Sequence, residues 1–502
     1  MSNPRRSAVA AALIAAGLAV SAASHAVRIN PDGHGQALIY PYYTARSSEP
    51  GHSFVTALTV INTSKNAKAL KVRFVEGKGG AEVQDFNLFL SAYDVWTAGV
   101  IASPSAQGAA LFTLDNSCTT PRISNSSANP NAFRNGAYSG IDAFGDSLDR
   151  TYEGYLEILE MGTIASGSGL EAAVTQRADL SSPNASKPSC ANLPVSAAVP
   201  PGLSAPTGGL IGNISIINVN DGTDFGLDAI ALSQWSDRVQ WTPAGSVGPT
   251  LADASPASSV VLDSRDEDDL MVVTRWTTGR DAVSALFMTY GISNDFTVEQ
   301  PIKAATDWII SMPTKRFYVR GNQTSAPFSN VPQPSQLPGP TNLPGEGASR
   351  VYFDRESLSS DLVECLPLFS YCRLEHLRYT VTTLPWVANE GFVRSGTVLG
   401  GENLGSAAST STKPAWINGR GTLTFDVDGQ KLVAPPGQSA IVNTQTGAAM
   451  IDVDVTYFGI PAVGFAAQAY RTSGLPGINP NVLSNYGGSF NHRYRRRIEV
   501  TQ

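Results

Sequence analysis

The sequence predicts an all-β protein of two or three antiparallel, immunoglobulin-like β-sandwich blocks joined by Pro/Gly/Ser-rich segments. Three observations support this class. Apolar and polar residues alternate over short runs that end in polar turns, which is the period of a half-buried strand. Only 15% of the 502 residues are charged, below the roughly 25% usual in soluble domains. No long amphipathic pattern begins and ends with helix-capping residues.

The first strands are expected within residues 54–100. Residues 54–61 and 69–76 flank a polar segment and predict a hairpin. Residues 85–91 alternate again, and residues 93–100 predict a further strand with Trp96 as a large aromatic anchor. Four strands in so short a stretch are typical of a β-sandwich.

Further strands are expected along the rest of the chain. The pattern of residues 210–219 ends at Asn220-Asp221-Gly222, which favours a turn, and residues 281–290 are largely apolar. The remaining strands are predicted at residues 306–310, 422–427, 431–434 and 452–458.

Two proline-rich segments, residues 181–209 and 325–347, divide the chain. Clustered Pro, Gly and Ser predict irregular structure. We therefore expect β-rich blocks at residues 27–180, 210–324 and 348–502. The same two segments are also compatible with long loops inside one larger domain.

Residues 1–26 have the pattern of a signal peptide. Arg5 and Arg6 precede an uncharged stretch, and Ser24-His25-Ala26 supplies the small residues expected before a cleavage site at Val27. The apolar stretch is shorter than the roughly 20 residues of a membrane span, which disfavours an anchor. We expect export to the cell surface or medium, with the periplasm as an alternative. Cleavage makes the formal net charge of −7 two units more negative.

No transmembrane segment is expected after cleavage. The longest strongly apolar stretch beyond the leader, residues 455–470, is interrupted by Gly459, Pro461 and Gly464. Such interruptions predict buried strands with a turn. Nucleic acid is not an expected partner, because the chain is acidic and has no extended basic face.

The chain has four cysteines, an even number that favours structural disulfides in an exported protein. Their order suggests the pairs Cys118–Cys190 and Cys365–Cys372. The sequence has no Cys-x-x-Cys motif, so a redox or zinc site is not expected.

The sequence NPDG at residues 30–33, followed by GQALIYPYYT at residues 35–44, resembles a largely uncharacterised group of exported proteins of Gram-negative bacteria. Residues 60–63, 85–97, 306–319 and 485–488 resemble the same group. The group is less closely similar to the surface-layer proteins that sheath nanopods and vesicles. This resemblance implies export and a surface role, and it supplies no catalytic residues.

One segment is similar to a hydrolase motif. Gly145-Asp146-Ser147-Leu148 resembles the block of a hydrolase family in which the serine is the nucleophile. A serine nucleophile needs a base within hydrogen-bond reach. Neither His376 nor His492 follows an aspartate at the Asp-x-x-His spacing of that family. We therefore interpret Ser147 as structural.

Acidic residues near strand ends are candidate calcium ligands, since Ca²⁺ prefers carboxylate oxygens. The candidates are Asp266, Asp268, Asp269, Asp426 and Asp428. None belongs to a complete twelve-residue calcium loop, so solvated turns are the alternative. No other cofactor is expected.

Two further groups are candidate contact residues. Arg493, Arg495, Arg496 and Arg497 are candidates for a surface contact, with lipopolysaccharide or a neighbouring subunit, or else form a solvated tail. The aromatic residues of 40–43, with Trp235 and Trp241, either stack on sugar rings or pack in the core.

Taken with the leader and the resemblance, these patterns favour an exported, non-catalytic structural or adhesive protein of the cell surface that assembles with itself in the manner of a surface layer. Its expected partners are further copies or other envelope components. The alternative is a secreted polysaccharide-binding protein or hydrolase, whose paired carboxylates a sequence alone does not reveal.

Overall fold

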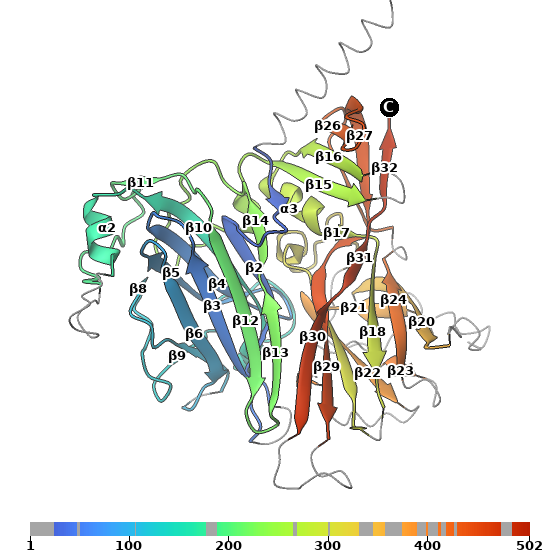
Figure 1. Cartoon of the computed structure of the whole chain (residues 1–502), viewed down its shortest axis with the longest axis horizontal. Coiled ribbons are helices and arrows are strands. Elements are labelled where there is room, and N and C mark those ends of the chain that lie inside the picture. The colour runs from blue at the N-terminus through green and yellow to red at the C-terminus, as the bar shows by residue number, and fades with distance from the viewer. Residues whose placement is uncertain are drawn as a thin grey trace, which may run out of the picture.

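The computed structural model describes residues 25–47, 51–105, 107–176, 188–264, 269–299, 302–330, 345–356, 374–388, 398–399, 410–412, 418–425, 429–472 and 484–502. Strands make up 50% and helices 7% of the structure, which confirms the predicted all-β class. Figure 1 shows one sandwich on the left, a second on the right and a further sheet above the second.

The first sandwich has an eight-stranded and a six-stranded sheet, both antiparallel. The larger has the order β1 (Arg28–Ile29), β14 (Ile230–Ser233), β2 (Ala37–Thr44), β10 (Glu153–Ile164), β4 (Lys68–Glu76), β5 (Glu82–Leu90) and β8 (Cys118–Thr120), with β11 (Leu203–Ser204) paired to β10. The smaller has the order β13 (Thr223–Asp228), β12 (Leu210–Asn218), β3 (Val55–Asn62), β6 (Val95–Ala102), β7 (Ala109–Phe112) and β9 (Asn131–Ala132). Their facing side chains, among them the fully buried Trp96, form the largest core.

The predicted strands within residues 54–100 are present, but the predicted hairpin between the first two is wrong. β3 pairs with β6 and β12, whereas β4 pairs with β5 and β10 in the other sheet. Residues 63–67 therefore cross from one sheet to the other. β3 alternates between half-buried and buried positions, whereas β4 is buried on both faces, so the two strands suit different sheets.

The second sandwich packs two five-stranded sheets. One has the order β21 (Leu374–Leu377), β20 (Glu346–Asp354), β24 (Asn418–Thr424), β18 (Gly291–Thr297) and β31 (Arg493–Arg495). The other has the order β23 (Thr410–Thr412), β22 (Val381–Ala388), β19 (Ala305–Ser311), β29 (Val463–Arg471) and β30 (Asn485–Asn491), with β22 and β23 parallel. In the core between them, the rings of Phe296 and Trp386 stack with centroids 4.2 Å apart.

A third sheet lies above the second sandwich in Figure 1. It contains β15 (Ser258–Ser264), β16 (Asp269–Arg275), β26 (Ser439–Asn443), β27 (Ala449–Phe458), β25 (Lys431–Val433) and β32 (Ile498–Thr501). One face packs on helix α3 (Gly279–Phe287). The short strands β17 (Met288–Thr289) and β28 (Ile460–Pro461) pair beside that helix.

Helix α3 corrects the strand expected at residues 281–290. The Thr278 side chain accepts a hydrogen bond from the backbone N–H of Asp281, which caps the helix at its start. Seven of the nine residues of α3 are buried. Its sequence therefore lacks the broad polar face by which a surface helix is told from a strand. The other helices within the described residues are short: η1 (Leu148–Tyr152), α2 (Gly169–Val174), η2 (Leu251–Asp253) and η4 (Lys315–Phe317).

Strand pairing crosses both proline-rich segments. β12 and β14, which follow residues 181–209, pair with β3 and β2, which precede them. Likewise β18 and β19, which precede residues 325–347, pair with β24 and β22 on the far side. Each segment thus connects strands of shared sheets, as a long loop would.

The predicted signal peptide lies outside the described residues except for His25 and Ala26. Val27, the predicted first residue of the mature chain, is buried, and its backbone N–H donates to Ser258 O at 2.9 Å. In the part of the chain that the structure describes, no helix has the length and apolar character needed to cross a membrane.

Candidate functional site

Ser147, in the segment similar to a hydrolase motif, caps the start of a short helix. Ser147 Oγ accepts a hydrogen bond from the backbone N–H of Asp149 at 3.2 Å, which caps η1. Asp149 in turn accepts from Arg46 at 2.7 Å. Within the described residues no hydrogen bond joins Ser147 to a histidine. The geometry of this segment is that of a cap and turn.

Cys118 and Cys190 form the predicted disulfide across 72 positions of sequence. Cys118 lies in β8, and Cys190 lies in the loop after α2. The bond holds this loop against the edge of the first sandwich, where Trp241 also donates to Ser196 O at 3.0 Å. Cys365 and Cys372 lie outside the described residues.

Of the calcium candidates, Asp266, Asp268, Asp426 and Asp428 lie outside the described residues. Asp269 begins β16 with an exposed side chain, and its backbone carbonyl accepts from Thr444. Over the described ranges, no three His, Cys, Asp or Glu side chains gather where they could hold a metal ion. Calcium binding stays a prediction.

The predicted arginine contact residues 493–497 point to different partners. Arg496 donates to the carbonyls of Leu262 at 3.1 Å and Leu286 at 2.8 Å. Leu286 is in the last turn of α3, whose free carbonyls attract a cation. Burial lowers the pKa of Arg496. The Arg496 side chain therefore stabilises the packing of α3 beside β15 within the chain.

The other three arginines lie nearer the solvent. Arg495 stacks over the ring of Tyr290 at 5.0 Å, and Arg497 stacks over Phe458 at 4.4 Å. Arg493 is exposed and has no side-chain partner among the described residues. Of the four predicted contact residues, Arg493 is thus the one most available to an outside partner.

The aromatic candidates near the mature N-terminus are core residues. Tyr40, Tyr42 and Tyr43 are fully buried, and each hydroxyl donates to an oxygen of the first sandwich. Trp235 is also fully buried, and Trp241 is 6% exposed. Packing, the alternative to sugar stacking, accounts for all five.

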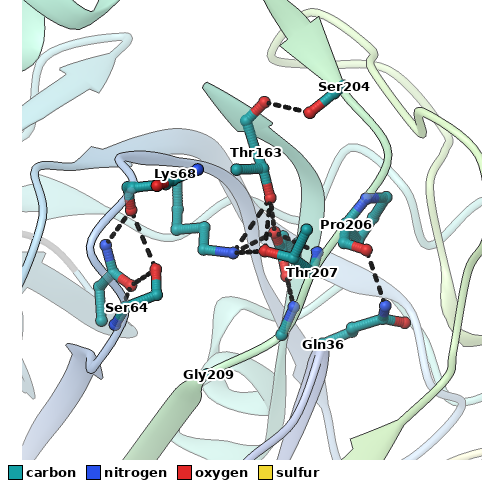
Figure 2. A network of polar contacts seen from close by, with 12 residues as sticks. Gln36, Ser64, Lys68, Thr163, Ser204, Pro206, Thr207 and Gly209 are labelled. Atoms are coloured by element: carbon teal, nitrogen blue, oxygen red, sulfur yellow. Dashed lines mark hydrogen bonds and ion pairs between the residues drawn. The ribbon is translucent and has the colours of Figure 1, made fainter. Parts of the chain in front are cut away.

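A buried ion pair organises one end of the first sandwich (Figure 2). Lys68 Nζ donates to Glu160 Oε1 at 2.7 Å, and both side chains are fully buried. Both residues also bind Thr207. Lys68 Nζ donates to the Thr207 hydroxyl at 2.6 Å, and the Thr207 backbone N–H donates to Glu160 Oε1 at 3.0 Å. Gln36 contributes a further bond to Pro206 O at 2.9 Å. The pair thus fixes the end of the proline-rich segment to β4 and β10.

A second group of buried charges lies on the other side of β4. Lys71 Nζ lies 3.3 Å from Asp85 Oδ2 and donates to Pro243 O at 3.0 Å. Arg73 donates to Pro249 O at 3.1 Å and pairs with Glu157 at 3.3 Å. Burial lowers the pKa of Lys71 to about 8, partly offset by Asp85. These charges therefore hold the loop between β14 and β15 over the sheet.

Arg316 connects this charge group to the second half of the chain. Its guanidinium donates to Glu157 Oε1 at 2.6 Å from η4, after β19. Tyr155 donates to the neighbouring Pro313 O at 2.9 Å. Both contacts join β10 of the first sandwich to the residues that directly follow β19 of the second sandwich.

The two sandwiches also meet where β13 and β30 lie side by side (Figure 1). Ser489 donates to Gly226 O. A Cβ at Gly487 would lie only 2.7 Å from Asp224 O, so glycine is required for this approach. The edge strands of two sheets thereby cover each other.

At one end of this junction Asp221 binds groups from both sandwiches. Its carboxylate accepts from His52 Nδ1 at 2.6 Å and from Asn218 Nδ2 at 3.0 Å, both in the first sandwich. Arg471 of β29 lies 3.4 Å from it, and Asn485 of β30 donates to the Asp221 carbonyl at 2.7 Å. The sequence indicated Asp221 only as part of the turn predicted at residues 220–222.

Asp307 is a second buried carboxylate between the sandwiches. It is 1% exposed on β19 and accepts from Leu399 N at 3.2 Å. Leu399 and its neighbour Val398 belong to the core cluster of the first sandwich. Burial raises the pKa of Asp307 to about 7, although hydrogen bonds from these two residues oppose the shift. The sequence indicated Asp307 only as part of the strand predicted at residues 306–310.

A pocket of about 650 Å³ opens beside α2. Its lining includes Leu170, Ala173, Pro194, Val199 and Pro201. Among the described residues, its polar side chains are those of serines and an asparagine, without a charged group. The pocket therefore offers shape and neutral hydrogen bonds, and no acid–base pair.

Comparison of the chain with protein-family models and with curated proteins found no match.

Proposed function

We propose that the protein is an exported, non-catalytic structural protein of the bacterial cell surface that assembles with copies of itself. The observation that carries the proposal is the junction between the sandwiches. Asp221, the β13–β30 contact and the Arg316–Glu157 ion pair join the two halves at separate places. A body held in this way resists relative movement of its halves, as a load-bearing subunit requires.

The disulfide gives independent support for export. Cys118–Cys190 fixes a surface loop covalently, and such bonds persist in oxidising compartments. The candidate nucleophile and most of the aromatic and basic candidates are engaged in contacts within the chain, which favours a structural use of these residues.

The test is electron microscopy of isolated envelopes, with a deletion strain beside the wild type. We expect an ordered layer or sheath that the deletion removes. In parallel, light scattering of purified mature chain should show self-association that weakens when calcium is chelated. A protein that stays monomeric at high concentration with and without calcium would contradict the proposal.

A second candidate, polysaccharide binding, is favoured by three exposed aromatic residues at one edge of the second sandwich. Tyr486, Phe490 and Tyr494 are 63%, 46% and 42% exposed where β30 leads into β31. Exposed aromatic rings stack readily on sugars. Co-sedimentation with envelope polysaccharide should fall on Tyr486→Ala if this function holds, and Tyr93→Ala, 68% exposed on the first sandwich, is the control.

A further inference from the structure

The third sheet has two faces of different character. Val261, Val272 and Ile441 face α3 and belong to its core. The alternate residues of the same strands point to the opposite side. This opposite side is here called the outer face.

The outer face is apolar across four neighbouring strands. The pairing register places Leu262 opposite Met271, and Met271 opposite Val442. A second row runs from Val260 to Val273 and on through β26 to Ile451. Leu262 is 62% and Ile451 44% exposed, and Met271 is half-buried, whereas Val260, Val273 and Val442 are buried within the chain. Exposed apolar side chains on a sheet face of this kind mark an interaction site.

The leader contributes the residue that covers part of this face. Ala26 is fully buried in a cluster with Val260 and Val273. Cleavage before Val27 removes Ala26. The mature chain therefore presents more of this apolar surface than the precursor does.

Charges at the two ends of β16 make the outer face complementary to itself. Its outward residues are, in order, Asp269, Met271, Val273 and Arg275. Asp269 and Arg275 are exposed, and neither side chain has a partner in the described part of the chain. A two-fold axis between Met271 and Val273 would bring Asp269 of each copy opposite Arg275 of the other. Isologous interfaces repeat every contact in this way.

We propose that the outer face is the contact surface of a two-fold symmetric dimer of the mature chain. The two sheets stack face to face, with the apolar rows inside and the Asp269–Arg275 pairs at the rim. This inference rests on the proposed self-assembly and identifies the surface through which it begins. A second copy is favoured over a different partner, because one two-fold axis brings the apolar rows of the two copies together and also places each Asp269 opposite an Arg275.

The first experiment is sedimentation equilibrium of the mature chain, residues 27–502, in chelator so that calcium bridging does not contribute. We expect a dimer whose dissociation constant rises at least tenfold in Leu262→Asp and in Ile451→Asp. Val247→Asp is the matched control, because Val247 is 88% exposed in a loop away from this sheet. All three positions are exposed, and circular dichroism verifies their folds.

The second experiment reverses the charges. Asp269→Arg alone and Arg275→Asp alone should each weaken the dimer, and the double variant should restore it, because every rim pair is then re-formed in the opposite sense. Failure of the double variant to restore association refutes the two-fold arrangement. Association that is unchanged by Leu262→Asp refutes this face and leaves the proposed function intact. A wild-type chain that is monomeric in every buffer overturns both.

Discussion

His52 and Asp221 lie 2.6 Å apart, Nδ1 to Oδ1, although 169 positions separate them in the sequence. His52 precedes β3, and Asp221 is in the turn between β12 and β13. Because Arg471 of the second sandwich approaches the other oxygen of the same carboxylate, this contact lies at the seam of the molecule.

Asp221→Ala should lower the free energy of unfolding by about 1–3 kcal/mol, since several hydrogen bonds to a buried acceptor are lost together. Asp224→Ala, in the same hairpin but exposed, should change it by less than about 0.5 kcal/mol. Urea unfolding of both variants measures the difference. Equal midpoints would show that the Asp221 contacts contribute nothing to stability.

Asp307 should give stability an unusual pH dependence. Its pKa is raised to about 7 in the folded protein, by burial first of all. Between about pH 4 and 7 the folded chain keeps a proton that the unfolded chain has released, so this group lowers stability as pH rises. Asn does not titrate, so Asp307→Asn removes this pH dependence. The free energy of unfolding of Asp307→Asn minus that of the wild type should therefore rise by up to about 4 kcal/mol from pH 4 to pH 8.

Urea midpoints at pH 4, 6 and 8 test this expectation. Asp295→Asn, an exposed carboxylate on β18, is the control. A difference between Asp307→Asn and wild type that is constant over this range would contradict a raised pKa at Asp307.

The disulfide should contribute substantially to stability. Loop-closure entropy for a separation of 72 residues corresponds to about 4 kcal/mol. Cys118→Ser should therefore unfold at a clearly lower temperature than the oxidised wild type, measured by calorimetry.

Mass spectrometry of the exported chain should find Val27 as its first residue and Cys118 joined to Cys190. A free Cys118 thiol in the undenatured protein would argue against this pairing.

Ser147→Ala should leave the protein folded and lower its stability by less than about 1 kcal/mol, as expected for loss of an exposed helix cap. Export and surface assembly should be unchanged. Ester cleavage by the purified wild type that disappears in a well-folded Ser147→Ala variant would instead support the hydrolase.

Arg496 and Arg493 should behave differently on replacement. Arg496→Ser leaves the carbonyls of Leu262 and Leu286 without their donor and should cost about 1–3 kcal/mol of stability. Arg493→Ser, three positions away and exposed, should be nearly neutral. Chemical unfolding compares them. If both variants unfold alike, the Arg496 contacts do not stabilise the fold.

The strands of the first sandwich were predictable because alternation is a local property. The positions of β3 to β6 agree with the pattern of residues 54–100. Their pairing was not predictable, since β3 and β4 separate into different sheets to meet β12 and β10, more than 75 positions away. A short polar segment such as residues 63–67 connects the strands of a hairpin and also strands of two different sheets, so it does not tell the two arrangements apart.

Helix α3 and the charges of β4 show two other limits. Short, fully apolar runs suit both buried strands and buried helices, and only Thr278 with Asp281 indicated the helix. Lys71 and Arg73 have the alternation of a solvent-facing row, yet both are buried. Their cover comes from residues 243–249, whose position no local pattern reveals.

The third sheet contains strands from both halves of the sequence, including β32 at the very end of the chain, while Val27 bridges to Ser259 at its edge. For the exported chain that we propose, the N-terminal part crosses the membrane first, so this sheet cannot close until β32 has also crossed. The first sandwich has all its strands once residue 233 has passed. In that case we expect the first sandwich to fold while the chain is still being exported, whereas the third sheet folds only after its last strand has crossed.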